Sequence, residues 1–327
     1  DDYVPYLPYD VERHPYLAIS TASGWDAVGA AYAETVERAL EGAELTTLAA
    51  KIDGDDRDER IRNAVLLVQD RVRYTGLLLG ENSILPTHAS EVLARGFGDC
   101  KDMATLLTGL LREMGIDASV ALLSAGTGTD VPADLPGLGL FNHAIVHVPG
   151  DPELWLDPTA RHVGPLTIPP PDQNRRALIA HPSQSRLVTT AELPSEATHI
   201  RTTMSIELAD DGWGNLTSRS LFSGPVAGSV RSYHSYLSDD GARSELEQDI
   251  ESLFRFGEIA EYRRSNADQG DAPFVIEWTL REFGRAHTSD TEAVAVVMPQ
   301  LFVEGLYDLY QESGPGERTE PFYNPFP

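Results

Sequence analysis

The sequence predicts an α+β protein in which helices come first and antiparallel strands follow, with a second, β-rich α+β domain after them. Apolar residues recur at helical spacing up to about residue 114, short apolar runs begin at about residue 118, and alternating strands begin near residue 200. The 327 residues suffice for two hydrophobic cores. We therefore expect domains at residues 21–185 and 186–327, after an extended N-terminal segment at residues 1–20.

Two amphipathic helices are predicted before residue 75. The first spans residues 25–40, with Ser23 as its N-cap. The second begins in the acidic run at residues 53–59 and continues to Val72. This run is not a calcium loop, because Arg57 and Asp58 stand where a ligand and the obligatory glycine are required. The run is therefore interpreted as the solvated start of a helix.

The single cysteine, Cys100, stands at the predicted start of a third helix that ends at Gly115. Two glycines and Asp99 precede it, as in a tight turn that leads into a helix, and Asp102 suits the positive end of the helix dipole. Backbone N–H groups at a helix start stabilise a thiolate. A structural cysteine is more often found in the middle of a helix, on its apolar face. The position of Cys100 therefore favours a nucleophile.

A base and an orienting acid follow on predicted strands. His143 lies in the apolar run at residues 141–148, and Asp157 ends a short strand that begins at Leu154. The turn at residues 149–152 makes the two strands antiparallel neighbours. His143 and Asp157 are then able to lie side by side, with the carboxylate fixing the imidazole tautomer that faces the thiol.

Other residues near these positions have weaker functional claims. Tyr74, Asn142 and Asp99 are candidates for oxyanion binding or positioning, although the backbone N–H of Cys100 is the better oxyanion donor on physical grounds. His147 shares a strand face with His143, but no cysteine or acidic cluster in the sequence supports a metal site there. No metal and no cofactor is expected.

These motifs together resemble the core of the bacterial transglutaminase-like superfamily over roughly residues 60–165. The resemblance is carried by Arg73-Tyr74-Thr75-Gly76, Leu79-Gly80, Pro86, Ala89-Ser90-Glu91-Val92-Leu93, Gly98-Asp99-Cys100-Lys101-Asp102, Asn142-His143 and Trp155-Leu156-Asp157-Pro158-Thr159. It implies a papain-like fold and places the family's catalytic triad on Cys100, His143 and Asp157. It also implies acyl transfer at amide carbonyls of peptide or protein substrates, through a thioester, which gives cross-linking, deamidation or proteolysis in different members.

Two other functions remain open from the sequence. A non-enzymatic envelope module could use the same core for binding or assembly. A metallohydrolase built on His143, His147 and Asp157 would need activity that chelation abolishes and Cys100→Ser spares. By analogy with the family, we expect a periplasmic or envelope location in a Gram-negative bacterium and interpret the chain as a fragment that follows another domain. The oligomeric state stays undetermined.

The rest of the chain carries no clear chemistry. Residues 124–140 form a glycine- and proline-rich loop that we expect to border the substrate cleft. In the second domain we expect strands at residues 200–208, 213–222 and 274–283. Residues 224–256 are predicted to be helical, with inward-facing side chains at Tyr233, Tyr236, Leu246, Ile250, Leu253 and Phe254. The tail at residues 314–327 is expected to lie over the surface or to be mobile.

The charge balance excludes some partners. The net charge is −26, and only 25 of the residues are lysine or arginine. A basic patch for nucleic acid or for anionic lipid is therefore not expected. No apolar stretch approaches the roughly 20 residues that cross a bilayer. With one cysteine there is no internal disulfide, so packing and hydrogen bonds must stabilise the fold.

Overall fold

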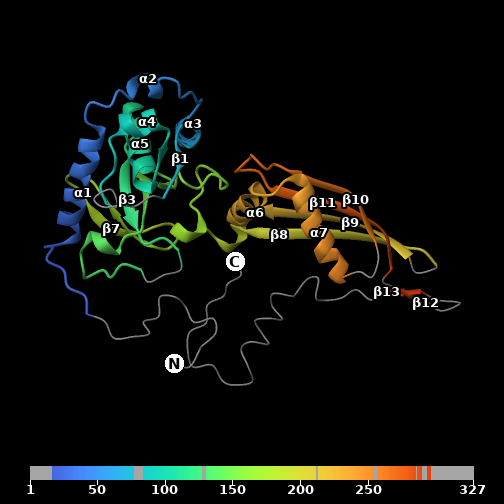
Figure 1. The fold of residues 1–327 in the computed structure, drawn as a ribbon. Coiled ribbons are helices and arrows are strands. Elements are labelled where there is room, and N and C mark those ends of the chain that lie inside the picture. The colour runs from blue at the N-terminus through green and yellow to red at the C-terminus, as the bar shows by residue number, and fades with distance from the viewer. Residues whose placement is uncertain are drawn as a thin grey trace. The chain divides into compact units, whose positions relative to one another are not determined.

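The computed structural model describes residues 17–76, 84–126, 130–210, 213–253, 257–284, 286–288 and 293–295. The chain divides into two compact units after Pro194 (Figure 1). The expected segment at residues 1–20 and the tail at residues 314–327 lie wholly or largely outside the described residues. Among those residues, every helix is too short or too polar to cross a lipid bilayer.

The helices of the first unit follow the apolar periodicity of the sequence. They are α1 (Trp25–Leu40), α2 (Thr46–Ala49), α3 (Arg57–Arg71), α4 (Ala89–Arg95) and α5 (Cys100–Glu113). The bounds of α1 confirm the prediction, but its N-cap is Gly24 rather than Ser23, and no side chain caps it. Asp56 caps α3 by accepting a hydrogen bond from the Glu59 N–H at 2.8 Å. The acidic run is thus the start of a helix.

A five-stranded sheet of order β5-β4-β3-β6-β7 lies against the helices. Its strands are β3 (Ser119–Leu123), β4 (His143–Val148), β5 (Leu154–Leu156), β6 (Arg176–Ile179) and β7 (Arg186–Thr189), and each neighbouring pair is antiparallel. The predicted hairpin of β4 and β5 is confirmed. Because β7 pairs with β6, the first unit extends past residue 185, and the division lies after Pro194 instead.

Both faces of this sheet are buried. Val120 and Leu122 of β3 join the large core with α5, whereas Ala121 and Leu123 join a smaller core with Ile145 on the other face. This explains why β3 and β4 are apolar at nearly every position. Helix α5 packs across β3 and β4 (Figure 1), and its residues from Met103 to Leu111 are fully enclosed. The start of this helix is thereby fixed beside the start of β4.

The connecting segments of the first unit contain four small elements. The short strand β1 (Arg73–Tyr74) pairs in parallel with β2 (Phe97–Gly98), which leads directly into α5. The short 3₁₀ helices η2 (Leu138–Leu140) and η3 (Pro170–Asp172) lie in the segments before β4 and before β6. Residues 127–129 of the predicted loop lie outside the described residues.

The second unit is an antiparallel sheet with two helices. The sheet has the order β10-β11-β9-β8, with β8 (His199–Leu208), β9 (Trp213–Ser223), β10 (Glu258–Ser265) and β11 (Phe274–Gly284). The helices are α6 (Pro225–Ser235) and α7 (Asp239–Leu253), and a short pair, β12 (Ala286–Thr288) and β13 (Ala293–Ala295), follows. The expected strands are present, and β10 is an additional one. The α+β class is confirmed in both units.

Two side chains of the second unit contradict the sequence prediction. Ile250 is buried with Leu216 and Leu280, as expected. Tyr233 and Tyr236, which we expected to face inward, are 57% and 85% exposed. They lie at the end of α6, where the chain turns towards α7, and the buried side of α6 is formed instead by the small residues Ala227 and Gly228 with Arg231. The burial of Leu253 and Phe254 lies outside what the structure describes.

Candidate active site

Cys100 is the first residue of α5, and a reciprocal capping box fixes its position. The Asp99 carboxylate accepts a hydrogen bond from the Asp102 N–H at 3.2 Å, and the Asp102 carboxylate accepts one from the Asp99 N–H at 3.4 Å. Such a box satisfies two of the backbone N–H groups that a helix start leaves without helical partners. Cys100 itself is 8% exposed. The thiol is thus held at the positive end of the helix dipole.

Two cations support the capping box from either side. Lys101, which is buried, forms an ion pair with Asp99, and Arg95 donates to Asp102 at 2.6 Å. Because buried carboxyl groups are costly unless paired, these contacts offset the cost of burying the box and hold it in place. Gly98 allows the turn to pass close to the box, since a Cβ at this position would lie 2.8 Å from the Asp102 Cβ.

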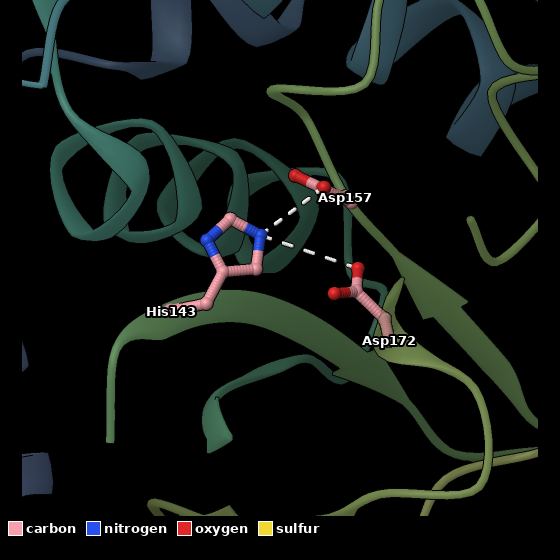
Figure 2. A group of neighbouring side chains, drawn as sticks. All are labelled: His143, Asp157 and Asp172. Atoms are coloured by element: carbon pink, nitrogen blue, oxygen red, sulfur yellow. Dashed lines mark hydrogen bonds and ion pairs between the residues drawn. The ribbon is translucent and has the colours of Figure 1, made fainter. Parts of the chain in front are cut away.

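The register of β4 and β5 brings His143 and Asp157 together. Val146 pairs with Leu156, so Asp157, the next residue, comes opposite Ile145 and on the same face as His143. His143 Nε2 lies 3.1 Å from Asp157 Oδ2 (Figure 2). The side chains are 14% and 7% exposed, respectively. The predicted contact of His143 with Asp157 is therefore present in the structure.

Asp157 is itself oriented by Thr159. Asp157 Oδ1 accepts hydrogen bonds from the Thr159 N–H at 2.8 Å and from the Thr159 hydroxyl at 2.7 Å, which leaves Oδ2 for His143. Burial tends to raise the pKa of Asp157, but the charge and hydrogen bond of His143 and the Thr159 bonds outweigh it and lower that pKa. Asp157 is thus held as a carboxylate.

His143 faces the thiol with its other side. Its imidazole lines the same cleft as the Cys100 thiol, and the two are close enough for the thiol to contribute to the raised pKa of His143. Because Nε2 faces the carboxyl groups, Nδ1 is the atom left for the sulfur, and it points away from the carboxyls in Figure 2. Burial opposes charge on His143, but Asp157 and the nearby Cys100 thiol raise its pKa well above the usual value. This imidazole is set to take the thiol proton.

A second carboxyl group, Asp172, lies beside His143 and Asp157, and the sequence prediction did not include it. Asp172 ends η3, and its Oδ2 lies 4.0 Å from His143 Nε2 (Figure 2). Burial, and then the negative charge of Asp157, raise the pKa of Asp172 to about 7. The only signal in the sequence was an acid after three prolines at residues 169–171, which local pattern does not connect with His143.

A cleft of about 90 Å³ opens at the thiol. Apart from the reacting groups and Lys101, its walls are mostly apolar or neutral. They are formed by Tyr32, Ile84, Leu122, Leu138, Phe141, Asn142 and Ala144. Leu138 comes from the end of the glycine-rich segment at residues 124–140, and Phe141 directly follows this segment, so the expectation that the segment borders the cleft agrees with the position of Leu138.

The three positioning candidates have different surroundings. Asn142 lines the cleft, but its amide bonds both to the N–H of Ala125, at 2.7 Å, and to its carbonyl oxygen, at 3.1 Å. Tyr74 lies on β1, is 46% exposed and is close enough for the charges of Cys100 and His143 to affect its pKa. Asp99 caps α5. Asn142 and Asp99 thus have structural hydrogen-bond partners, and Tyr74 and Asn142 are both exposed, whereas Asp99 is buried.

The described residues contain one group of side chains with the donor types of a metal site. His143, Asp157 and Asp172 place one nitrogen and two carboxyl oxygens within 4.8 Å of one another. In this set Nε2 and Asp157 Oδ2 already bond to each other. His147, by contrast, bonds to Glu153 at 2.5 Å and packs against Trp155, so it has structural partners.

The chain was compared with protein families, curated proteins and solved structures. The model of the transglutaminase-like superfamily matches residues 46–157. No curated protein matches the chain. A crystal structure of a protein described as a "putative protease" from Parabacteroides distasonis is similar over 96% of this chain, with 12% identity and a TM-score of 0.45. The match covers 61% of that protein, so this chain spans about three fifths of its length. The chain therefore contains a transglutaminase-like superfamily domain at residues 46–157, in which Cys100, His143 and Asp157 all lie.

Proposed function

We propose that this protein is a cysteine-dependent acyltransferase or amidohydrolase that acts on amide groups of peptides or proteins. The single observation that carries the proposal is the proximity of the Cys100 thiol to His143, whose Nε2 is bonded to Asp157. A thiol at a helix start, a base within hydrogen-bonding reach and a carboxylate behind the base are the parts that nucleophilic catalysis requires.

In the first half-reaction, the Cys100 sulfur attacks the carbonyl carbon of the amide. His143 Nδ1 takes the thiol proton as the S–C bond forms, and Asp157 stabilises the imidazolium through Nε2. The backbone N–H of Cys100 is placed to stabilise the oxyanion. His143 then returns the proton to the leaving nitrogen, the C–N bond breaks, and ammonia or an amine departs. A thioester on Cys100 remains.

In the second half-reaction, a water molecule or an amine attacks the thioester carbon. His143 takes a proton from the attacking group and gives it to the sulfur when the C–S bond breaks. Water yields a carboxylic acid, which is deamidation or peptide cleavage, and an amine yields a new amide, which is cross-linking. The mostly apolar walls of the cleft suit an uncharged acyl group beside the thiol and limit water there.

The experiment that tests this function separates the three outcomes. The protein is incubated with a glutamine-containing protein and a fluorescent amine, and amine incorporation, ammonia release and peptide cleavage are measured together. We expect at least one activity in the wild type and none in Cys100→Ala. Glu113→Gln serves as a surface control outside the site. Equal signals in the wild type and in Cys100→Ala would overturn the proposal.

Alkylation with iodoacetamide gives a second test that needs no substrate. An active site predicts rapid modification of Cys100 well below pH 8, where a free thiol reacts slowly because its pKa is about 8.5. The reaction should slow in His143→Ala. Modification that follows an ordinary thiol in both proteins would favour a binding module without catalysis.

A further inference from the structure

Asp172 is a buried carboxyl group that lies beside His143 and Asp157. It is 1% exposed, and its Oδ2 has no hydrogen-bond partner. A carboxyl group that served only to fill space would be replaced at lower cost by an apolar side chain, because a polar group buried without a partner is destabilising. The position of Asp172 beside the catalytic residues therefore calls for an explanation.

The backbone of Asp172 is fixed independently of the triad. Its N–H donates to the Pro169 carbonyl oxygen at 3.0 Å, and its carbonyl oxygen accepts from the Thr190 hydroxyl at 2.6 Å. The Pro171 carbonyl oxygen accepts from the Gly126 N–H at 2.7 Å. The prolines restrict the backbone of this turn further. The side chain is thus presented to His143 and Asp157 by a rigid segment.

The charges that act on Asp172 come from two elements of the fold. They are Asp157, after β5, and His143, on β4. Of the neighbouring elements, α5 presents Cys100, which lies beside His143, and the segment before β6 presents Arg175, which donates to the Ser124 carbonyl oxygen and pairs with Asp130. Among the described residues the nearest carboxylate is therefore Asp157, which has an oxygen atom within 4.8 Å of an Asp172 oxygen. Two carboxyl groups bond to each other only through a shared proton.

We propose that Asp172 is a positioning residue of the active site, which carries a proton and donates it in a hydrogen bond to Asp157, so that Asp157 stays aligned with His143. This role rests on the proposed function, since it acts through the Cys100–His143–Asp157 arrangement. Asp172 touches neither the thiol nor the cleft. It steadies the carboxylate from the side opposite Thr159. Burial favours the neutral acid, in keeping with the raised pKa of about 7.

Infrared difference spectroscopy tests the proton directly. A protonated carboxyl group gives a C=O stretching band that a carboxylate lacks. Ordinary carboxyl groups have lost their protons by pH 6, because their pKa values are about 4. We expect one residual band in the wild type that disappears near pH 7 and is absent in Asp172→Asn. Asp130→Asn is the matched control, because this carboxylate lies near η3 but bonds to Arg176, and it should keep the band.

Alkylation of Cys100 at pH 6 tests the positioning role. Asp172→Ala removes the donor, and we expect about a threefold to tenfold slower reaction, the effect of one lost hydrogen bond. Asp172→Asn supplies an N–H donor of the same size, so it should recover most of this rate. A purely structural role would slow both variants alike. Thermal unfolding of both variants shows whether each is folded.

Three results would overturn the proposal. They are a wild type without a residual carboxyl band, equal alkylation rates in the Ala and Asn variants, and an effect of EDTA on the band, which would place a cation between the carboxyl groups. The proposed function fails in a different way. Suppose that the protein turned over no amide, but that the carboxyl band and the alkylation rates of the variants were as expected. The Asp172–Asp157 proposal would then be supported, and the proposed reaction would be wrong.

Discussion

The substitution Asp157→Asn is the sharpest test of the catalytic arrangement, because Thr159 decides how an asparagine must lie. Two Thr159 donors, the N–H at 2.8 Å and the hydroxyl at 2.7 Å, meet Asp157 Oδ1. The asparagine oxygen must take this position, since an amide NH₂ would face two donors. The NH₂ group then replaces Oδ2, at 3.1 Å from His143 Nε2. The atom that faces His143 Nε2 thereby changes from a hydrogen-bond acceptor to a hydrogen-bond donor.

This exchange reverses the imidazole tautomer. His143 Nε2 must accept the amide hydrogen, so the ring proton of a neutral His143 moves to Nδ1, the atom that faces Cys100. The thiol then has no base. The lost carboxylate charge also removes the main opposition to burial, so the pKa of His143 falls. Comparable substitutions in Ser–His–Asp enzymes cost about 10⁴-fold in kcat, so we expect a loss of roughly 10²- to 10⁴-fold here.

Two measurements check this expectation. The first is kcat/KM for ammonia release or amine incorporation, and the second is the alkylation rate of Cys100 between pH 5 and pH 9. Thr159→Val is the matched control, because it removes one hydrogen bond to the Asp157 carboxylate and leaves its charge, so its cost should be only about 10-fold. If Asp157→Asn retained both rates within about threefold of the wild type, the tautomer argument would be wrong.

Three further predictions concern stability, each measured by urea unfolding. Asp99→Ala should lower the free energy of unfolding by about 3–5 kcal/mol, because it removes the α5 cap and leaves Lys101 buried without its partner. Asp99→Asn should lower it less, since asparagine also caps. Equal losses in the two variants would contradict this explanation. Asp172→Asn should stabilise the protein at pH 8 and not at pH 3. The folded-state pKa of about 7 lies above the ordinary 3.8, so ionisation costs stability progressively between these values, by about 4 kcal/mol at most. If Asp172→Asn raised the free energy of unfolding by the same amount at both pH values, the raised pKa of Asp172 would be wrong. Leu107→Ala should cost about 2–5 kcal/mol, because this side chain is fully buried in the α5 core; a loss below about 1 kcal/mol would mean that the core is not packed as described.

The elements with strong local signals were predictable. The start of α5 is determined by neighbouring residues, because Asp99 and Asp102 form a capping box directly after the glycine turn. The β4–β5 hairpin has a short turn, so the relation of His143 to Asp157 follows from the register of neighbouring strands. The N-cap of α1 failed as a prediction because Ser23 and Gly24 are both acceptable caps, and only the backbone path chooses between them.

The predictions that failed concern features that depend on contacts between residues distant in the chain. Strands β6 and β7 have only four residues each, and they form because β6 pairs with β3 and β7 pairs with β6. The boundary after residue 185 was misplaced for this reason. Tyr233 and Tyr236 have the apolar character of core residues, yet the turn after α6 leaves them exposed. Aromatic residues carry polar groups that tolerate water, so composition alone did not determine their burial.

The sequence by itself determined that Cys100 begins a helix and that His143 and Asp157 lie side by side, because helix capping and hairpin register are local relations that residue order encodes. Only the tertiary structure determined that a second carboxyl group, that of Asp172, lies beside His143 and Asp157. Asp172 is 15 residues from Asp157 and 29 from His143 in the chain. The turn at residues 170–172, tied to Gly126 and Thr190, brings its side chain to the pair. Such a meeting depends on how β6 folds back against β3, and no local pattern of residues specifies that.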